Sequence, residues 1–328
     1  MRFNSTPPAP LEQWAIVLAA GDGTRLRGLT TDRNGNTIPK QFCSLRGGRT
    51  LLQDALRRAA RVVRPDRVVV VVAERHRRWW EREVVSLPCR NIVVQPDNRG
   101  TACGILLPLF SILQRDHAAQ VAVFPSDHAV REEFVLERTM RATLRELCGD
   151  ELVLLGIPPE YAEADYGWVV PAADGTSHVA AFVEKPNPAE AEACLRRGAL
   201  WNSFIFAARG SAMLALCDRR VPSLTAAFRT AFASSVRGRT RAVARLYQSL
   251  DLVDFSRAVL QGSEPFLRLR VVPTCGWTDL GTPARVAKCL DGLRAVRSRG
   301  PGSKELLDLS EAVARFRNAK TDEHAAVE

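Results

Sequence analysis

From residue 14 to residue 124 the chain alternates between short apolar runs and longer segments with helical spacing. The apolar runs are rich in β-branched residues and are bounded by polar ones, which is typical of buried strands. They cover Trp14 to Ala20, Arg67 to Ala73, Asn91 to Gln95 and Gln120 to Phe124, and the helical segments cover Leu51 to Arg64, Arg75 to Val85 and Thr101 to Gln114. This alternation predicts an α/β fold, in which a mostly parallel sheet is flanked by helices.

Beyond Glu151 the pattern changes, and strands outnumber helices. Four more strands are expected, at Leu152 to Ile157, Gly167 to Val170, Val179 to Glu184 and Leu200 to Ala207. We expect this smaller, β-rich part to form a second layer that covers the first part from the side and supplies a second substrate pocket. Farther on, the pattern predicts a largely helical stretch, a strand and a short C-terminal helix, at Ser211 to Gln261, Phe266 to Val272 and Glu305 to Phe316.

The composition is that of an ordinary globular protein, with 46% hydrophobic and 25% charged residues. No run approaches the roughly 20 apolar residues of a membrane span, and the first residues lack the apolar core of a signal peptide, so we expect a cytoplasmic protein without membrane contact.

Eight cysteines without a CxxC pair and five histidines without metal-ligand spacing suggest neither a disulfide framework nor a zinc site. The net charge of +10 is spread along the chain without a recognisable nucleic-acid module, so we expect anionic small substrates and no nucleic acid.

A glycine-rich loop, Gly21-Asp22-Gly23-Thr24-Arg25, follows the first predicted strand. It lacks the third glycine of the dinucleotide fingerprint, because Leu26 stands there, and it lacks the Gly-Lys-Ser/Thr end of the P-loop. These residues are compatible with two interpretations. The loop is either a phosphate cradle of another kind, to which Arg25 adds charge, or a strand-to-helix turn.

Polar clusters follow three of the predicted strands: GDGTR the first, QPDNRG the third and PSDH the fourth. In open α/β sheets ligands bind at the carboxyl ends of the strands, so we expect these clusters at one ligand site. Asp127 of PSDH and Asp279 of CGWTDLGTP both end predicted strands. Each is either a cap of the following helix or a ligand of Mg²⁺, which prefers one or two carboxylates together with phosphate oxygens.

Only five of the 46 basic residues are lysines, and two of them, Lys40 in IPKQF and Lys185 in FVEKP, stand beside a proline. A fixed backbone can pre-position a compact ammonium for a phosphate, although a solvated lysine is the default. Gln95 and the segment from Asn98 to Ala102 present amides at a helix N-terminus, which suits a nucleotide base. YGW around Gly167 and WNS around Asn202 suit a sugar, or equally a core.

Taken together, LAAGDGTRL, PKQF, QPDNRGTACGIL, FPSDH, YGWV, FVEKP, WNS and WTDLGTP, in this order, resemble the sugar-1-phosphate nucleotidyltransferases. Within that family the likeness is greatest to the branch that transfers guanylyl groups to mannose 1-phosphate. The resemblance runs from about Trp14 to Leu290. It implies a Rossmann-like catalytic domain at 13–290 between an irregular tail at 1–12 and a linker with a C-terminal helix at 291–328. It also implies GTP and mannose 1-phosphate as substrates, Mg²⁺ as cofactor, GDP-mannose and pyrophosphate as products, and a possible homodimer.

The resemblance assigns roles residue by residue. By motif match the catalytic residues are Arg25, Lys40, Asp127 and Asp279, of which Asp127 and Asp279 hold the metal. The nucleotide-binding residues are Ala20, Gly21, Gly23, Thr24, Gln95, Gly100 and Thr101, and the sugar-phosphate-binding residues are Gly167, Glu184, Lys185 and Asn202.

Two positions depart from the family pattern. The loop at 26–38 is longer and more polar than usual, which would suit a lid. Phe204 follows Asn-Ser where many relatives have glycine, so it would narrow the sugar pocket or redirect the backbone, and another hexose or another nucleotide stays an alternative. A glycosyltransferase is disfavoured because no Asp-x-Asp pair occurs in the sequence, and a non-catalytic sensing relative would be expected to lack one of the four catalytic residues.

Overall fold

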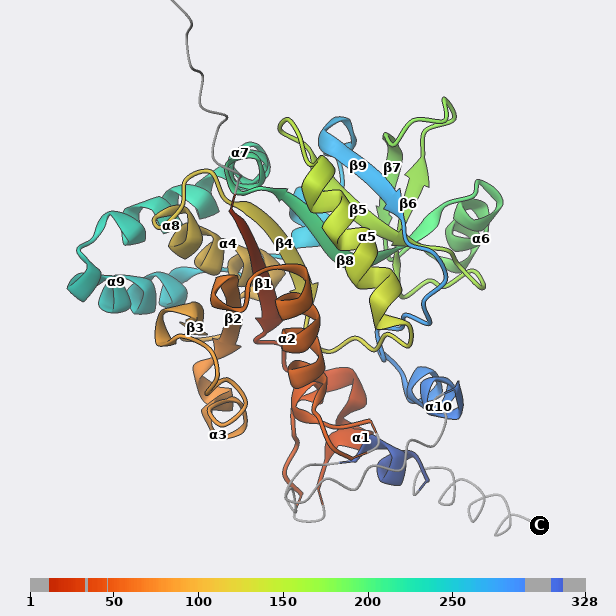
Figure 1. Ribbon diagram of the computed structural model, residues 1–328, viewed down its shortest axis with the longest axis horizontal. Helices are drawn as coiled ribbons and strands as arrows, with labels where there is room; N and C mark the ends of the chain where they lie inside the picture. The colour runs from red at the N-terminus through yellow and green to blue at the C-terminus, as the bar shows by residue number, and fades with distance from the viewer. Residues whose placement is uncertain (1–11, 33–34, 46, 293–307, 315–328) are drawn as a thin grey trace, which may run out of the picture.

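The computed structural model describes residues 12–32, 35–45, 47–292 and 308–314, and one mixed sheet forms its centre (Figure 1). The strands of the sheet are β1 (Gln13–Ala19), β2 (Val68–Ala73), β3 (Ile92–Gln95), β4 (Gln120–Pro125), β5 (Leu152–Ile157), β6 (Gly167–Pro171), β7 (Val179–Glu184), β8 (Leu200–Arg209) and β9 (Leu267–Val271). Their order is β3-β2-β1-β4-β8-β5-β9, and β6 and β7 branch from β8 as a hairpin. The pairs among β1, β2, β3 and β4 are parallel, as the sequence predicts.

The prediction of a second layer beyond Glu151 is wrong. β8 pairs antiparallel with β4 on one side and with β5 on the other, so this half of the chain extends the same sheet. The reason is that β4 has one edge unpaired after β1 is placed, and backbone groups at a buried edge need partners. Only the β6–β7 hairpin departs from the sheet, and it is attached through β6 to Leu200 and Trp201 of β8.

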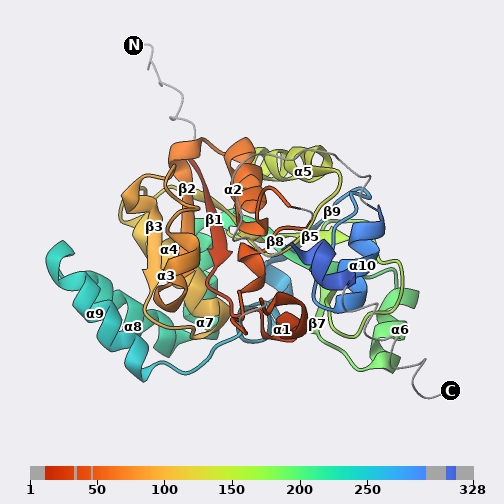
Figure 2. The same cartoon turned by 90° about the horizontal axis from the view of Figure 1, so that it is seen from below.

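Helices cover both faces of the sheet, and Figure 2 shows α2 and α5 on one side and α7 and α8 on the other. The helices are α1 (Arg27–Thr30), α2 (Leu51–Val62), α3 (Arg77–Trp80), α4 (Gly100–Leu113), α5 (Glu133–Glu146), α6 (Pro188–Arg196), α7 (Gly210–Arg220), α8 (Pro222–Ala233), α9 (Val236–Ser249) and α10 (Pro283–Gly292). Side chains of β1 alternate between two cores: Ala15 and Val17 pack with α2, and Trp14 and Ile16 pack with α4. The sheet therefore separates two hydrophobic cores.

The helix predicted from Arg75 to Val85 is shorter than expected, because α3 ends at Trp80. The Trp80 indole donates to the Ala73 carbonyl at 2.8 Å, and turns follow, with Glu83 N bonded to the Trp80 carbonyl. Tertiary contacts of this kind override local helical spacing. No helix in the described part of the chain is both long and apolar enough to cross a membrane.

The chain returns to the main body after α10. Residues 309–314 are helical, and Leu309, Ala312 and Val313 are buried in the core that α2 also lines. Leu309 N donates to the Ser44 carbonyl at 2.8 Å, so this short helix packs beside the segment that follows PKQF. Residues 1–11 of the predicted tail, most of the linker, and residues 305–307 and 315–316 of the predicted helix lie outside the described residues.

Candidate active site

The carboxyl ends of β1, β3 and β4 and the start of α4 line a cavity of about 380 Å³. All three polar clusters contribute to it, through Gly21 and Gly23, through Gln95 and Asn98, and through Asp127. Asn98 Nδ2 also donates to Asp22 Oδ2 at 3.1 Å, which ties the loop after β1 to the loop after β3. The structure thus brings together the clusters that the sequence places at one sheet edge.

The glycine-rich loop lies directly on the PKQF segment. Gly23 has a φ of 62°, and a Cβ atom there would come within 2.9 Å of Lys40 N. Gln41 Nε2 donates to the carbonyls of Ala19 and Gly21 at 3.1 and 2.8 Å. These contacts fix the loop without a side-chain cap on the 3-10 turn Thr24–Leu26, and both the phosphate cradle and the strand-to-helix turn are compatible with this geometry. The Arg25 side chain is 56% exposed, and its Nη2 lies 4.0 Å from Asp279 Oδ2, so its charge is within reach of a ligand.

Lys40 connects two parts of the site. Its side chain is 6% exposed, and Nζ lies 2.9 Å from Asp127 Oδ2 and donates to the Asp279 carbonyl at 2.5 Å. An ammonium is suited to this place because it offers three donors around one point charge. A buried lysine that bridges the ends of two distant motifs is a structural feature of the site and not a solvated surface residue.

Asp127 and His128 lie at the end of β4, and both line the cavity. Burial opposes ionisation of Asp127, but the charge of Lys40, the charge of protonated His128 and hydrogen bonds from Lys40 and the backbone together lower the pKa of Asp127. Burial lowers the pKa of His128 to about 4, although the charge of Asp127 opposes this shift. Near neutral pH the site therefore holds an ionised carboxylate beside a neutral imidazole, and His128 cannot serve as a cation there.

Asp279 is placed differently from Asp127. Its Oδ1 accepts from Tyr166 Oη at 2.9 Å and from Gly281 N at 2.8 Å, while Arg285 Nη1 lies 3.0 Å from Oδ1 and 3.2 Å from Oδ2. Burial opposes its ionisation, but protonated His128, Arg285 and Lys40 together lower the pKa of Asp279. The carboxylate is ionised, and both of its oxygens already have partners.

A divalent cation would find one suitable carboxylate in this arrangement. Asp127 faces the cavity at the sheet edge and fits a ligand that also takes phosphate oxygens. Asp279 is less available, because its Oδ1 accepts from Tyr166, Gly281 and Arg285, and its Oδ2 lies 3.2 Å from Arg285 Nη1. Among the described residues, no group of three or more His, Cys, Asp or Glu side chains is positioned to hold a metal.

The side predicted to face the base is held by the segment that follows α9. Gly100 has a φ of 84°, and a Cβ there would come within 2.3 Å of the Val253 carbonyl. Thr101 Oγ1 accepts from Phe255 N at 2.7 Å, so its hydroxyl anchors this segment as well as lining the cavity. Gln95 is 1% exposed, and its Nε2 reaches the Asp97 carbonyl at 3.4 Å. These residues shape the cavity wall mainly through backbone and packing.

The residues predicted to bind the sugar phosphate cluster around the β6–β7 hairpin. Gly167 pairs with Glu184 in register, and a Cβ at Gly167 would meet Glu184 Oε2 at 2.5 Å and Asn202 Cβ at 3.3 Å. Burial, reinforced by the charge of Asp254, raises the pKa of Glu184 to about 7. Asn202 Oδ1 accepts from Phe204 N at 3.1 Å, which links this cluster to the cavity that Phe204 lines.

Three residues other than glycine have positive φ in the described part of the chain, and all three belong to this site. They are Lys185 (50°), Phe204 (56°) and Leu280 (51°). Such conformations are strained for side chains with a Cβ, and they persist where the surrounding structure requires them. Phe204 holds a positive φ, which glycine adopts without strain, and it also lines the cavity. Its effect on the sugar pocket stays a prediction.

Several residues of the site had no role in the sequence interpretation. Three of them stand inside motifs of the sequence interpretation: Gln41 in PKQF, His128 in PSDH and Tyr166 in YGW. Their position in these motifs could have identified them as site residues. Arg285 and Asp254 belong to no such motif. They reach the site through tertiary packing, in which Arg285 contacts Asp279 and Asp254 lines the cavity.

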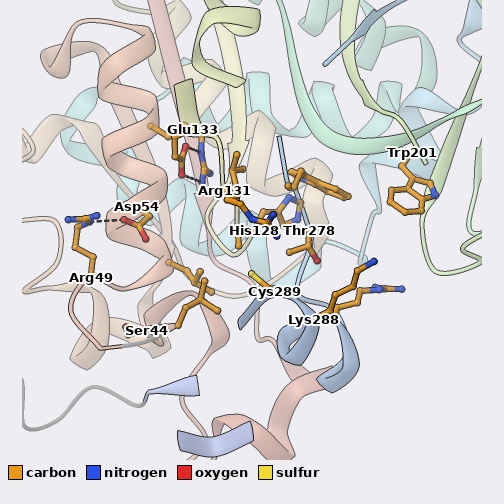
Figure 3. Close-up of a pocket in the computed structure, with 18 of the residues that line it drawn as sticks. Ser44, Arg49, Asp54, His128, Arg131, Glu133, Trp201, Thr278, Lys288 and Cys289 are labelled. Atoms are coloured by element: carbon orange, nitrogen blue, oxygen red, sulfur yellow. Dashed lines mark hydrogen bonds and ion pairs between the residues drawn. The ribbon is translucent and has the colours of Figure 1, made fainter. Parts of the chain in front are cut away.

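A second cavity, of about 350 Å³, also reaches His128 and is shown in Figure 3. It lies among α2, the segment 129–133, the segment 276–278 and α10, with Trp201 on one side. Its charged side chains are largely paired with one another. Arg58 meets Glu133 through two contacts of 2.7 Å, Arg49 meets Asp54 at 2.7 Å, and Lys288 meets Glu160.

Comparison with known proteins agrees with this architecture. The model of the nucleotidyl transferase family matches residues 14–292, and the chain therefore belongs to the nucleotidyl transferase family. The xanthan biosynthesis protein XanB of Xanthomonas campestris pv. campestris is 30% identical over 81% of this chain and 57% of its own length. The mannose-1-phosphate guanylyltransferase RfbM of Salmonella typhimurium is 32% identical over 61% of this chain and 42% of its own length. The chain thus spans about half the length of these curated relatives.

Among solved structures, a Thermus thermophilus protein described as a mannose-1-phosphate geranyltransferase is similar to this chain. It has a TM-score of 0.73 and 27% identity, covering 84% of this chain and 79% of its own. The agreement extends the family assignment from sequence to the arrangement of the sheet and helices.

Proposed function

We propose that this chain is a mannose-1-phosphate guanylyltransferase, which transfers a guanylyl group from GTP to mannose 1-phosphate and releases pyrophosphate. One observation carries the proposal: buried Lys40 joins the WTDLGT turn to Asp127, which lines a nucleotide-sized cavity. The names of the relatives point to the same substrates. Another nucleotidyltransferase with the same cavity but a different sugar is the second candidate, because Phe204 lines the cavity.

The proposed reaction needs no nucleophilic side chain. The phosphate of the sugar is already anionic, so the chain must align it with the α-phosphorus and neutralise charge as pyrophosphate leaves. The cradle at Gly21 and Gly23 would hold the triphosphate, with Arg25 and Lys40 facing its charge. Lys185, next to Glu184 on the sugar side, would meet the phosphate of the sugar.

A divalent metal ion, Mg²⁺ by resemblance, would add charge neutralisation on the phosphates, with Asp127 as the residue of this chain that fits it best. Neutral His128 beside Asp127 leaves the carboxylate as the only anion of that strand end. Lys40 holds Asp127 Oδ2 at 2.9 Å and so fixes the direction of the carboxylate. Orientation of the reacting groups, more than proton transfer, would account for the rate enhancement.

The eight cysteines are free, which supports a reducing compartment and hence our proposal of a cytoplasmic enzyme. A homodimer remains a prediction.

Pyrophosphate release over a grid of the four nucleoside triphosphates and several hexose 1-phosphates tests the proposal. We expect the highest kcat/KM with GTP and mannose 1-phosphate. A clear preference for another pair would replace the substrate assignment and keep the class, whereas no release with any pair would overturn the proposed function.

A further inference from the structure

An acidic residue lies in the middle of the glycine-rich loop that follows β1. Gly21 and Gly23 line the cavity of about 380 Å³, and Asp22 stands between them. A carboxylate that faced the cavity from this place would repel an anionic ligand. The side chain of Asp22 instead contacts Arg75 and His76, which belong to the turn after β2. The end of β2 therefore contributes to the site beside the ends of β1, β3 and β4.

Arg75 is the cation that meets Asp22. Its Nη2 donates to Asp22 Oδ1, and its Nη1 donates to Asp97 Oδ1 at 3.4 Å. One guanidinium thus joins the loop after β1 to the loop after β3, and both loops contribute residues to the cavity wall. The planar fork of an arginine, with donors in fixed directions, is suited to two acceptors at once.

His76 contacts the same oxygen of Asp22 without adding charge. Its Nε2 lies 3.4 Å from Asp22 Oδ1, its side chain is 7% exposed, and its ring packs against those of Phe42 and Trp79. Burial lowers the pKa of His76, although the charge of Asp22 opposes this shift. The imidazole is therefore neutral near pH 7, and Arg75 supplies the charge that balances Asp22 in this cluster.

The second oxygen of Asp22 connects to the start of α4. Asn98 Nδ2 donates to Asp22 Oδ2 at 3.1 Å, and Asn98 Oδ1 accepts from Gly100 N at 3.0 Å. The carboxylate thus has Arg75 on one oxygen and Asn98 on the other. Contacts from two different loops fix its direction.

We propose that Arg75 is a positioning residue for the triphosphate, because it neutralises the carboxylate of Asp22 and holds it at the end of β2. This inference rests on the proposed function, in which the loop of Gly21 and Gly23 faces the phosphates. With Arg75 in place, the backbone of this loop can meet an anion without repulsion from the acidic residue beside it. Without Arg75, the charge of Asp22 would oppose a ligand that carries several negative charges.

The test measures GTP binding to the full-length protein by isothermal titration calorimetry, with magnesium in the buffer. Arg75→Met should bind GTP about tenfold more weakly than the wild type, since Asp22 then keeps an unbalanced charge beside the phosphates. Equal affinities of the wild type and Arg75→Met would overturn the proposal. Should Arg75→Met fail to fold, Arg75→Gln replaces it with the same expected loss.

Arg77→Met is the matched control. Arg77 lies in the same segment, its side chain is 47% exposed against 43% for Arg75, and it pairs with Glu74 at 2.8 Å. Its loss removes the same charge from the same region without touching Asp22, so the GTP affinity should stay within about twofold of the wild type. An equal loss in Arg77→Met and Arg75→Met would show a general effect of net charge and would contradict the proposal.

A double variant separates neutralisation of Asp22 from direct contact between Arg75 and the phosphates. In an Asp22→Asn background, Arg75→Met should change the GTP affinity by less than about twofold, because no negative charge is left to neutralise. The full loss in that background would mean that Arg75 itself binds GTP, and the proposal would be wrong. Arg75→Lys, which keeps the charge, should recover most of the affinity that Arg75→Met loses, and no recovery would contradict a role through charge.

Steady-state kinetics distinguish failure of this inference from failure of the proposed function. In Arg75→Met the KM for GTP should rise, while kcat at saturating GTP stays within about twofold and the KM for mannose 1-phosphate is unchanged. If the wild type releases pyrophosphate and the KM for GTP is the same in both proteins, only the role of Arg75 is lost. A wild type that neither binds nor uses any nucleoside triphosphate removes the proposed function and this inference with it.

Discussion

The two cavities of this molecule have similar volumes, about 380 and 350 Å³, and both reach His128. They differ in how their polar groups are used. The first is lined by strand ends, glycines and amides around Asp127. The second is lined by loop and helix residues, and several of its charged side chains are paired within the protein, as in the pairs Arg58–Glu133 and Arg49–Asp54. A ligand that enters the second cavity must break these ion pairs or bind without contacting them. The first cavity presents polar groups that are held in place and can still bind a ligand.

The comparison shows that volume alone does not identify a functional cavity. What distinguishes the first is a strained backbone at Phe204, which lines it, and a buried lysine, Lys40, that contacts its lining residue Asp127. Strain of this kind collects where function requires an unusual backbone. In the second cavity, we expect the buried Arg58–Glu133 pair to contribute to the stability of the fold. Four predictions test this division, and they are ordered by expected effect.

The largest contrast is between two lysines. Lys40→Met should lower kcat for pyrophosphate release on the order of 1,000-fold, because the charge that faces the triphosphate and fixes Asp127 is lost. Lys288→Met, which removes a cation from the second cavity, should leave kcat within about twofold, since an exposed ion pair contributes little. Similar losses in both variants would abolish the distinction between the cavities.

Arg58→Met should show the opposite pattern, with stability affected and catalysis spared. Arg58 is 2% exposed and bonds Glu133 through two nitrogens, so its loss leaves a partly buried carboxylate without a partner. We expect the free energy of unfolding to fall by about 3 kcal/mol, measured by urea denaturation. A kcat reduced more than the folded fraction explains would give the second cavity a part in the reaction.

Glu184 should make stability depend on pH. Its pKa is raised to about 7 in the folded protein, so its stabilising contribution is complete below about pH 4.5 and is lost as the pH rises through 7. Thermal unfolding between pH 5 and 8.5 should show the wild type losing about 2 kcal/mol relative to Glu184→Gln over this range. Parallel curves for the two proteins would show that Glu184 ionises as an ordinary exposed carboxyl.

The smallest effect is expected at Phe204. Phe204→Gly relieves a strained φ of 56° and removes a ring from the cavity wall. We expect kcat/KM ratios among hexose 1-phosphates to change by a few-fold, about the value of one apolar contact. An identical substrate profile would show that the ring bounds the cavity without touching the sugar.

The first half of the sheet was predictable because its information is local. Each of β1 to β4 is a continuous apolar run ended by polar residues, and parallel pairing follows from the helices between them. The insertion of β8 between β4 and β5 was not predictable, since a strand's pattern does not specify which distant edge it pairs with. For the same reason, the single layer replaced the two that the sequence suggested.

The same difference between local and long-range information applies to the residues of the site. Lys40 and Asp127 stand in recognisable motifs, but their contact joins residues far apart in the chain, and no motif states it. Asp279 also stands in a recognisable motif, yet the partner of its carboxylate, Arg285, lies at the start of α10 with no polar pattern around it. Backbone strain at Lys185 and Phe204 has no local sequence signal either, because neither residue type favours positive φ.

The short helix at 309–314 has a practical consequence for handling the protein. Its Leu309 N donates to the Ser44 carbonyl, four residues from Lys40, so a label introduced into this helix would lie near the PKQF segment. The amino end of β1 lies at the opposite edge of the sheet from the cavity, because the carboxyl end of that strand feeds the glycine loop. Tags and surface-immobilisation chemistry for binding assays therefore belong ahead of Gln13.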